Sequence, residues 1–380
     1  MLVVQRPQHL AEVPRLGRAH EEGGRVCQSE PADPAERAGG DPAHRDPPCD
    51  QPGQLHLEVR PARRLRRRAR RLPRRRLAAG VVREGVPRHT PQSARPRLGR
   101  MTNQPTLTLN NDVRIPQLGF GTFQVDEKET QRVVEAALEA GYRHIDTAAG
   151  YYNEAGVGAA LRASGLPREE VFLTTKLRNG DQGRDRARDA FEASREALGV
   201  DAVDLYLIHW PVPGNGLAGE TWEVFQELYA EGAVRAIGVS NFLPDHLADL
   251  LGGADVTPAV NQIEVHPTFQ QPDTQQASRD AGLAVEAYAP IGQGADLELA
   301  PVTEAAQGHG VSPAQVVIRW HLQEGRIVIP KSATPERIRS NADVFGFELD
   351  DAQMRAISGL DTPERMFPDP QTADFTQFRS

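Results

Sequence analysis

Short apolar runs alternate with longer amphipathic stretches along the chain from about residue 105 to residue 360. Each run has the length of a strand that is buried on both faces of a sheet. The runs start roughly every 25 to 45 residues, which leaves room for one helix between each pair. The eight runs are Gln117–Thr122, Arg143–Asp146, Val171–Lys176, Leu205–Trp210, Ala233–Asn241, Ala259–Glu264, Ala284–Tyr288 and Ile327–Pro330.

Between these runs, apolar residues recur with helical spacing. Ala187, Ala190, Phe191 and Leu198 fall on one face of a predicted helix, and the small polar Ser194 interrupts that face. Three other segments carry helical spacing or a helix-start signal. They are Val134 to Leu138, the capping sequence Ser312-Pro313-Ala314-Gln315, and Leu349–Leu360.

The order of these elements predicts a (β/α)8 TIM barrel, because eight strand–helix units occupy about 250 residues. An open doubly wound sheet would carry G-x-G-x-x-G after its first strand, and this sequence has none there. Before the first unit, Thr106–Leu109 and Val113–Ile115 flank the turn-forming Asn110-Asn111-Asp112. That pattern predicts a β-hairpin in front of the barrel.

Composition divides the chain at Met101. Residues 1–100 contain 22 of the 44 basic residues, 13 of the 30 prolines and no aromatic residue. Their net charge is +11, whereas residues 101–380 carry −19. Because a segment without aromatics has little large apolar surface to offset the entropy of ordering, we predict a disordered Arg/Pro-rich extension over 1–100. We assign the barrel to 101–380.

The arginine run Arg63–Arg76 has two interpretations. Its charge density is typical of a segment that binds nucleic acid phosphates. Alternatively, the segment arises from a translation start called too far upstream, since every basic residue before Met101 is Arg and Met101 is the next Met after Met1. We favour the second interpretation, and the acidic barrel offers no matching basic face by composition.

The positions of the cysteines and the hydropathy of the chain limit where in the cell the protein is expected. Both cysteines, Cys27 and Cys49, precede Met101, so the barrel has neither a disulfide framework nor a cysteine–metal site. We expect no metal. The chain lacks the apolar run of about 18 residues that a membrane span needs and the apolar core of a signal peptide. We expect a cytoplasmic monomer that binds no membrane.

Polar residues follow the apolar runs at the ends where (β/α)8 enzymes place their chemistry. Any one of them could be a satisfied structural residue, but Asp, Tyr, Lys and His at the ends of three consecutive strands favour function together. The residues at these ends are Gly121, Thr122, Asp146, Lys176, His209, Ser240, Asn241, Gln262, Tyr288, Lys331 and Ser332.

Several motifs, in this order, resemble the aldo-keto reductase family. They are DTAAGYYNE, TTK, LYLIHWP, GVSNF, NQIEVHP, AYAPIGQG and VIPKSATPERI. The short segment after LYLIHWP and the sequence around AYAPIGQG are most similar to the prokaryotic 2,5-diketo-D-gluconate reductase branch. The resemblance covers about residues 105–370 and does not extend to residues 1–100.

The resemblance implies a catalytic tetrad of Asp146, Tyr151, Lys176 and His209, which reduces a carbonyl compound by hydride transfer from a nicotinamide cofactor. A Tyr hydroxyl is a weak acid, with a pKa near 10. An adjacent Lys ammonium stabilises the phenolate and eases proton donation. Asp146 is expected to pair with Lys176, and His209 to orient the carbonyl oxygen. The family spacing selects Tyr151 over its neighbour Tyr152.

The resemblance also implies the cofactor contacts. Ser240, Asn241 and Gln262 match residues that hydrogen-bond the nicotinamide carboxamide, and Tyr288 matches the ring that stacks on the nicotinamide. Gly121 and Thr122 are also expected to bind the cofactor. The residues that match the group holding the adenosine 2′-phosphate and adenine are Lys331, Ser332, Arg337 and Asn341.

The residues around Lys331 point to an anion independently of the resemblance. Thr334-Pro335 begins a predicted helix just after Lys331, so backbone N–H groups, a helix dipole and two cations converge. An ordinary positively charged helix start is the alternative. The convergence favours NADPH over NADH.

Phe123, Trp210, Arg178 and the tail after Leu360 are the expected walls of the substrate pocket. Many relatives have Trp where this chain has Arg178, two residues beyond the catalytic Lys. Arg178 either makes the pocket mouth polar, which would favour acidic or hydroxylated carbonyl substrates, or turns outward to solvent.

The predicted substrate is a small-molecule carbonyl compound: a small aldehyde, an α-dicarbonyl or a keto sugar such as 2,5-diketo-D-gluconate. A barrel that binds the cofactor and regulates without turnover is the alternative function. The intact tetrad argues against it.

Overall fold

The computed structural model describes residues 104–375, and the predicted extension over residues 1–100 lies outside them. Eight parallel strands form one sheet in the order β3 to β10, each paired with its neighbour in the sequence. The strands are β3 (Phe120–Gly121), β4 (His144–Asp146), β5 (Phe172–Leu177), β6 (Val203–Ile208), β7 (Val234–Ser240), β8 (Val260–Glu264), β9 (Ala284–Tyr288) and β10 (Ile327–Val328). Each overlaps one of the eight predicted runs.

The two end strands of this sheet meet and close the barrel. Leu118 and Val328 form a parallel bridge. Gly119 N–H donates to the Val328 carbonyl at 2.8 Å, and Val328 N–H donates to the Gln117 carbonyl at 2.9 Å. The (β/α)8 prediction is therefore confirmed.

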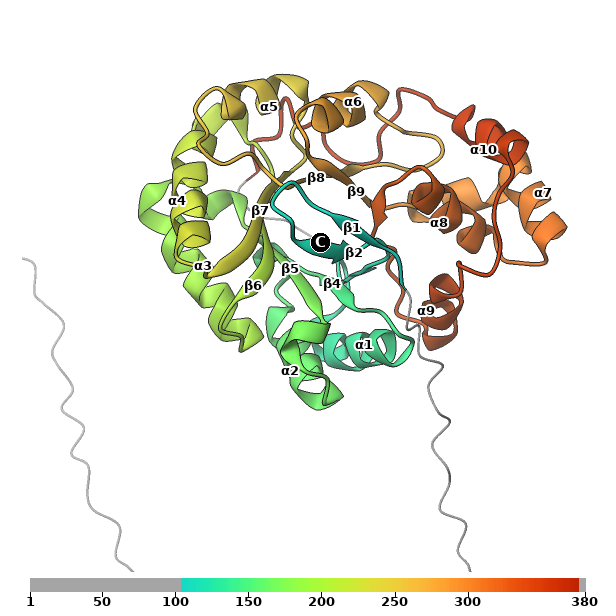
Figure 1. The fold of residues 1–380 in the computed structure, drawn as a ribbon, viewed down its shortest axis with the longest axis horizontal. Coiled ribbons are helices and arrows are strands. Elements are labelled where there is room, and N and C mark those ends of the chain that lie inside the picture. The colour runs from blue at the N-terminus through green and yellow to red at the C-terminus, as the bar shows by residue number, and fades with distance from the viewer. Residues whose placement is uncertain (1–103, 376–380) are drawn as a thin grey trace, which may run out of the picture. The chain divides into compact units, whose positions relative to one another are not determined.

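Helices surround the strands on the outside, as the ribbon in Figure 1 shows. Several begin at side-chain caps that the sequence supplies: Asp126 caps α1, Ser312 and Gln315 form a capping box on α8, and Asp350 caps α10. The helices are α1 (Glu127–Glu139), α2 (Glu154–Ser164), α3 (Arg184–Leu198), α4 (Ala218–Ala230), α5 (Pro244–Leu251), α6 (Pro272–Asp280), α7 (Ala300–His309), α8 (Pro313–Gln323), α9 (Pro335–Ala342) and α10 (Asp351–Ser358).

The interrupted stripe of α3 has a polar explanation. Ala187, Phe191 and Leu198 are buried as expected, and Ser194 is buried with them. The Ser194 hydroxyl donates to Glu154 Oε2 at 3.2 Å. A buried hydroxyl needs such a partner, so this position satisfies a buried carboxylate instead of adding apolar contact.

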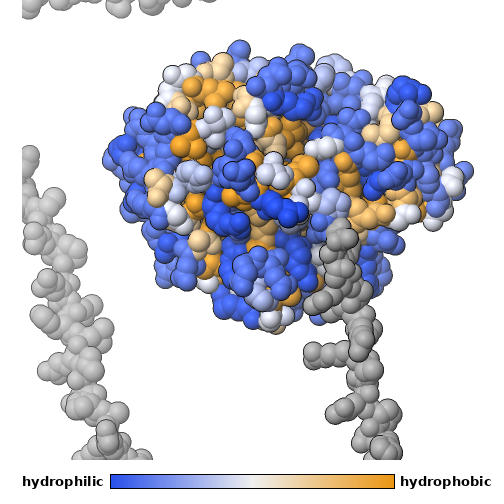
Figure 2. All heavy atoms as spheres, in the orientation of Figure 1, coloured by the Kyte–Doolittle hydropathy of each residue, from blue (hydrophilic) through white to orange (hydrophobic). Residues whose placement is uncertain are grey.

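The predicted hairpin is present and covers the amino-terminal ends of the barrel strands. β1 (Thr106–Thr108) pairs antiparallel with β2 (Arg114–Pro116), and the ribbon shows it lying across the middle of the barrel (Figure 1). Leu109 and Ile115 pack against residues near the strand starts, such as Phe172. Figure 2 shows this face, whose rim is mainly hydrophilic with scattered hydrophobic side chains. The carboxyl ends of the strands lie at the other end of the barrel.

Two kinds of feature are absent from the described residues. No helix between residues 104 and 375 is long and apolar enough to cross a membrane. Over the same range, no group of three or more His, Cys, Asp or Glu side chains is arranged to hold a metal ion.

Candidate active site

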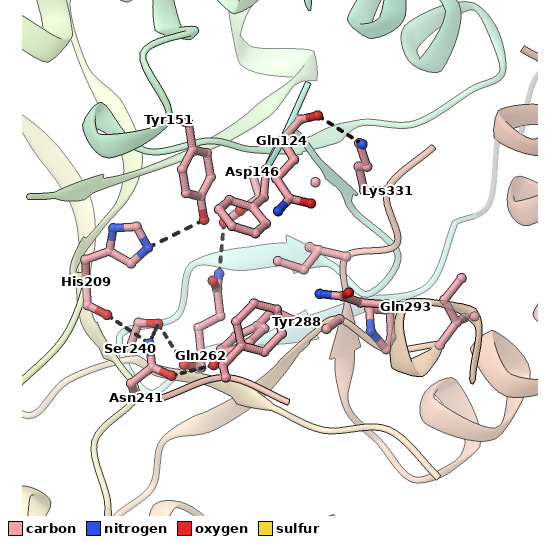
Figure 3. A pocket seen from close by; sticks show the side chains of 18 of the residues that line it. Gln124, Asp146, Tyr151, His209, Ser240, Asn241, Gln262, Tyr288, Gln293 and Lys331 are labelled. Atoms are coloured by element: carbon pink, nitrogen blue, oxygen red, sulfur yellow. Dashed lines mark hydrogen bonds between the residues drawn. The ribbon is translucent and has the colours of Figure 1, made fainter. Parts of the chain in front are cut away.

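A cavity of about 420 Å³ opens at the carboxyl ends of the strands. Four chain segments bring the predicted tetrad to it: Asp146 ends β4, Lys176 lies near the end of β5, and His209 follows β6 directly. Tyr151 ends a short 3-10 helix, Ala149–Tyr151, in the loop after β4. Figure 3 shows Tyr151 and His209 facing each other across this end of the cavity.

Asp146, Tyr151 and Lys176, here called the Lys176 cluster, form a continuous chain of contacts. Lys176 Nζ donates to Asp146 Oδ1 at 2.6 Å, to the Thr147 carbonyl at 2.9 Å and to Tyr151 Oη at 3.3 Å. Lys176 is fully buried and Asp146 nearly so. A buried pair of this kind is stable only when its remaining hydrogen-bonding groups are satisfied, and here all three ammonium donors have an acceptor.

Burial and charge act against each other on the proton affinities of the Lys176 cluster. Burial opposes the charge of Lys176, but the Asp146 carboxylate and Tyr151 raise the pKa of Lys176 above its ordinary value. Burial raises the pKa of Tyr151 to about 12, although the Lys176 charge acts to lower it. The expectation that Lys176 lowers this pKa therefore holds for its own contribution and not for the net result, because desolvation of the phenolate outweighs it.

His209 faces Tyr151 as a neutral imidazole. Its Nε2 lies 3.5 Å from Tyr151 Oη. Burial, together with the Lys176 charge, holds the pKa of His209 well below its usual range. The neighbouring Tyr152 is different, since it adopts a left-handed backbone conformation and its side chain is 53% exposed. The structure therefore places Tyr151 and not Tyr152 against the cavity.

A second set of predicted residues forms a hydrogen-bonded web in the cavity wall, visible in the lower left of Figure 3. Asn241 Nδ2 donates to the His209 carbonyl at 3.0 Å, and Tyr288 Oη donates to Asn241 Oδ1 at 2.7 Å. Ser240 Oγ donates to the Gln262 carbonyl at 2.9 Å, and Gln262 Nε2 donates to Asp146 Oδ2 at 2.9 Å. Gln262 thus links the web to the Lys176 cluster, a contact that sequence reasoning did not anticipate.

The predicted cationic residues lie at another end of the cavity. Lys331 and Arg337 line it beside the start of α9. Lys331 Nζ donates to the Gln124 carbonyl at 3.1 Å, and burial lowers the pKa of Lys331. Neither cation forms a salt bridge with any carboxylate in the part of the chain that the structure describes. Their positive charge is available to an anion.

Of the other predicted cofactor residues, one lines the cavity and three do not. Gly121 lines the cavity. Thr122 is buried and its hydroxyl donates to the Asp146 carbonyl at 3.0 Å. Ser332 Oγ accepts from Thr334 N–H at 3.2 Å, and Asn341 is buried in α9. Thr122, Ser332 and Asn341 are not among the lining residues.

Aromatic side chains form the wall next to Tyr151. Phe123, Trp210 and, from the tail, Phe367 line the cavity as expected. The Phe123 ring lies 5.1 Å from the Tyr151 ring and 6.3 Å from the Phe367 ring, centroid to centroid.

Arg178 requires a correction, because it does not line this cavity. Its Nε lies 2.7 Å from Asp181 Oδ2, and the second oxygen of the same carboxylate accepts from Nη2 at 3.1 Å. A carboxylate three residues away holds the guanidinium in a bidentate pair and directs it away from the substrate wall.

One buried group beneath the site, Glu286, was not predicted from the sequence. Glu286 is fully buried in the barrel, and neither of its carboxylate oxygens has a hydrogen-bond partner among the described residues. His144 Nε2 lies 3.6 Å from Glu286 Oε1. Burial and the Asp146 charge raise the pKa of Glu286 to about 8, so it is largely protonated at neutral pH. Its place two residues before Tyr288, on the barrel-facing side of a strand, was the available signal.

Other lining residues missed by sequence reasoning come from the loop after β3, from the loop after β9 and from the residue that follows β10. They are Gln124, Ala289, Pro290, Ile291, Gln293, Gly294, Leu297 and Ile329. The loop after β9 contributes six of these residues, three of them within the 3-10 segment η5 (Gly292–Glu298). It carries no charged lining residue, so charge-based reasoning had no signal for it.

Comparisons with known proteins agree with this geometry. Residues 117–362 match the aldo/keto reductase family. An aldo-keto reductase of Mycolicibacterium smegmatis is 52% identical over 272 residues, covering 72% of this chain and 99% of the relative. A 9,11-endoperoxide prostaglandin H2 reductase of Trypanosoma cruzi is 47% identical, covering 70% and 95%. The solved structure of a mutant of Gox0644 in complex with NADPH is 44% identical with a TM-score of 0.69, covering 72% and 100%.

Proposed function

The chain belongs to the aldo/keto reductase family, and from that premise we propose that it reduces small carbonyl compounds to alcohols with NADPH. The observation that carries the proposal is the contact chain from Asp146 through Lys176 to Tyr151, which ends in a cavity beside a neutral His209.

The cavity suits the cofactor by its charge and by the chemical groups that line it. Lys331 and Arg337 supply an unneutralised positive end beside the amino terminus of α9, which suits a phosphate. Tyr288 and the amides of Asn241 and Gln262 supply a ring and polar groups nearer the Lys176 cluster. The solved neighbour with NADPH supports this choice of cofactor. When bound, NADPH supplies the hydride that reduces the carbonyl carbon.

Residues of this chain supply the proton that the reduction consumes. Tyr151 donates its hydroxyl proton to the carbonyl oxygen, and the resulting phenolate lies 3.3 Å from the Lys176 ammonium. Because the pKa of Tyr151 is raised to about 12, the hydroxyl is protonated at neutral pH, as reduction requires. His209, which stays neutral, donates a hydrogen bond that orients the carbonyl oxygen. Solvent returns the proton to Tyr151.

The aromatic wall bears on the substrate. Phe123, Trp210 and Phe367 surround the end of the cavity near Tyr151, and Arg178 is turned to Asp181. Lys331 and Arg337 are the only cations among the described lining residues, and they are assigned to the cofactor. We therefore infer that uncharged aldehydes and α-dicarbonyls are better substrates than acidic keto sugars such as 2,5-diketo-D-gluconate.

NADPH oxidation by the full chain tests the proposal. The panel contains methylglyoxal, benzaldehyde and 2,5-diketo-D-gluconate, with NADH as the competing cofactor. We expect turnover with the first two substrates, preference for NADPH, and a loss of about 10²- to 10⁴-fold in kcat for Tyr151→Phe. Tyr152→Phe is the matched control and should retain activity, since Tyr152 is exposed.

Two results would contradict this reading in different ways. NADPH binding without turnover on any substrate would favour a barrel that binds the cofactor and regulates. Efficient turnover confined to 2,5-diketo-D-gluconate would leave the mechanism intact and overturn the substrate inference.

A further inference from the structure

A second buried ionic group lies beside the cavity and contributes no side chain to it. We call it the His266 cluster: Glu264 at the end of β8, His266 and Thr268 in the loop that follows, and Asp296 in η5. His266 Nδ1 lies 2.8 Å from Asp296 Oδ2, and His266 Nε2 lies 3.2 Å from Glu264 Oε1. Thr268 Oγ1 donates to Asp296 Oδ1 at 2.7 Å. Both ring nitrogens of His266 therefore face carboxylates.

The charges in this cluster are consistent with an imidazolium. Burial opposes a charge on His266, but the hydrogen bonds to Asp296 and Glu264 raise the pKa of His266 to about 9. Burial acts against the Asp296 carboxylate, yet His266 and Thr268 hold its pKa below the usual range. His321 on α8 is a neutral ring, because burial and the Arg326 charge keep the pKa of His321 well below its ordinary value. Arg365 lies over the nearby Phe269 ring at 5.1 Å.

Each carboxylate of the cluster is connected to a different segment that lines the cavity. Asp296 is part of η5, whose residues Gln293, Gly294 and Leu297 line the cavity. Glu264 instead holds the C-terminal tail at Met366 and Phe367.

The tail is held through its backbone. Glu264 Oε1 accepts from Met366 N–H at 2.7 Å, and Glu264 Oε2 accepts from Phe367 N–H at 3.3 Å. Phe367 lines the cavity and meets the Tyr288 ring at 5.2 Å. A single imidazole therefore joins the residue that anchors the tail to the residue that anchors η5.

We propose that His266 is a positioning residue that sets the placement of two cavity walls, the tail at Phe367 through Glu264 and the η5 segment through Asp296. The part of the proposal that concerns substrate and cofactor affinity rests on the proposed function. The part that concerns the tail does not, because it is a statement about backbone hydrogen bonds within the chain.

Two substitutions separate the two contacts. In His266→Asn, the amide nitrogen takes the place of Nδ1 and keeps the donor to Asp296 while the donor to Glu264 is lost. In His266→Gln, the amide nitrogen takes the place of Nε2, so the Glu264 contact is kept and the Asp296 contact is lost. His309→Asn is the matched control, because His309 is half-buried on α7 and bonds Gln353.

The rate of trypsin cleavage after Arg365 measures how readily the tail detaches. The scissile bond is Arg365–Met366, and its N–H is the one that donates to Glu264. We expect His266→Asn to release the peptide that begins at Met366 about tenfold faster than the wild type, since local opening controls cleavage. His266→Gln and His309→Asn should stay close to the wild type. Mass spectrometry measures the peptide, and circular dichroism checks the fold.

The wild-type protein offers the same test through pH. Because the pKa of His266 is raised to about 9 in the folded protein, its contacts stabilise the tail fully below the unfolded pKa. That stabilisation is lost as the pH rises through about 9. Cleavage after Arg365 should therefore accelerate as the pH rises from about 6.5 to about 9, and level off above that, after normalisation to a free peptide of the same sequence. This arm remains informative if a His266 variant fails to fold.

The Kd for NADPH and the KM for the substrate then test the η5 wall and the Phe367 wall separately. We expect His266→Gln to raise the Kd for NADPH, measured by quenching of protein fluorescence, by about tenfold more than His266→Asn does. His266→Asn should raise KM for the carbonyl substrate while kcat changes less, because Phe367 moves and the Lys176 cluster does not.

Unchanged cleavage after Arg365 in a folded His266→Asn protein, together with a flat pH series, would overturn the proposal. Equal effects of the Asn and Gln variants on both walls would also overturn it, since the two contacts would then not be separable. A protein that shows no turnover at all would refute the proposed function but leave the cleavage tests fully interpretable.

Discussion

The Lys176 cluster and the His266 cluster use the same chemistry in two different settings. In each, a buried cation lies within 2.8 Å of a carboxylate oxygen, with further polar partners around it. The Lys176 cluster is built on strands β4 and β5. Its ammonium lies 3.3 Å from the Tyr151 hydroxyl, which borders the cavity. The His266 cluster joins two loops and the tail, and its charge stays between Glu264 and Asp296.

Since both pairs are buried, this difference shows that the supporting element, strand or loop, determines what a buried ion pair does. A cation on adjacent strands has a fixed position, so it can stabilise a developing phenolate with little reorganisation. A cation between loops contributes most by holding those loops, because loops are the segments that open most readily. The two clusters should therefore respond differently to removal of a charge.

Removal of the Lys176 charge should produce the largest effect. Lys176→Met leaves the Asp146 carboxylate buried without its cation, and we expect about 3–5 kcal/mol lower stability in urea denaturation. Turnover should fall by about 10³-fold or more, since the phenolate loses its counter-charge. The double variant Asp146→Asn with Lys176→Met should recover much of the stability and none of the activity. Recovery of activity would show that the charge is not needed.

Replacement of the protonated carboxyl beneath this cluster should have the next largest effect, and it should depend on pH. The pKa of Glu286 is raised to about 8, so folding favours its protonated form and stability falls as the pH rises from about 4.5 to 8. Glu286→Gln removes this penalty. The variant should gain stability relative to the wild type with rising pH, by about 5 kcal/mol at most, and level off above about pH 8. A constant difference from about pH 5 to 9 would contradict the assignment.

Neutralisation of one carboxylate in the His266 cluster should have a smaller effect that is confined to the cavity walls. Asp296→Asn keeps a polar partner for His266 and Thr268 but removes a charge, so we expect KM for NADPH to rise by about three- to tenfold with kcat nearly unchanged. Asp343→Asn, at the end of α9, is the control for loss of one negative charge. A drop in kcat as large as that of Lys176→Met would erase the distinction between the clusters.

The half-exposed pair Arg178–Asp181 should contribute least. Exposed pairs are worth about 0–1 kcal/mol, so Arg178→Ala should change stability by no more than that. Because Arg178 is turned from the cavity, the ratio of kcat/KM for acidic and neutral substrates should not change. A selective loss of activity on 2,5-diketo-D-gluconate would return Arg178 to the substrate wall.

Local sequence patterns predicted most of the framework. The eight strands, the hairpin and the capped helix at Ser312 follow from spacings of two to four residues and from turn and cap residues, which act through nearby backbone. The order of strands in a barrel then places their carboxyl ends together, so Asp146, Lys176 and His209 could be grouped before the structure was known.

The choice of partner for each polar side chain depended on the tertiary structure. Arg178 was assigned to the substrate wall, but Asp181 holds it elsewhere. The raised pKa of Glu286 could not be predicted from its position in the strand, because desolvation depends on what surrounds the side chain in three dimensions. The net pKa of Tyr151 was expected in the wrong direction for the same reason.

By itself, the sequence determined the positions of the strands, the type of barrel and which residues reach the catalytic end, since backbone periodicity and turn chemistry act over a few residues. Only the tertiary structure decided that Glu264, Asp296 and the Met366 backbone converge near His266. Those groups lie about 30 to 100 residues apart in the chain. Packing alone brings them within hydrogen-bonding distance and removes the water that would otherwise weaken their charges.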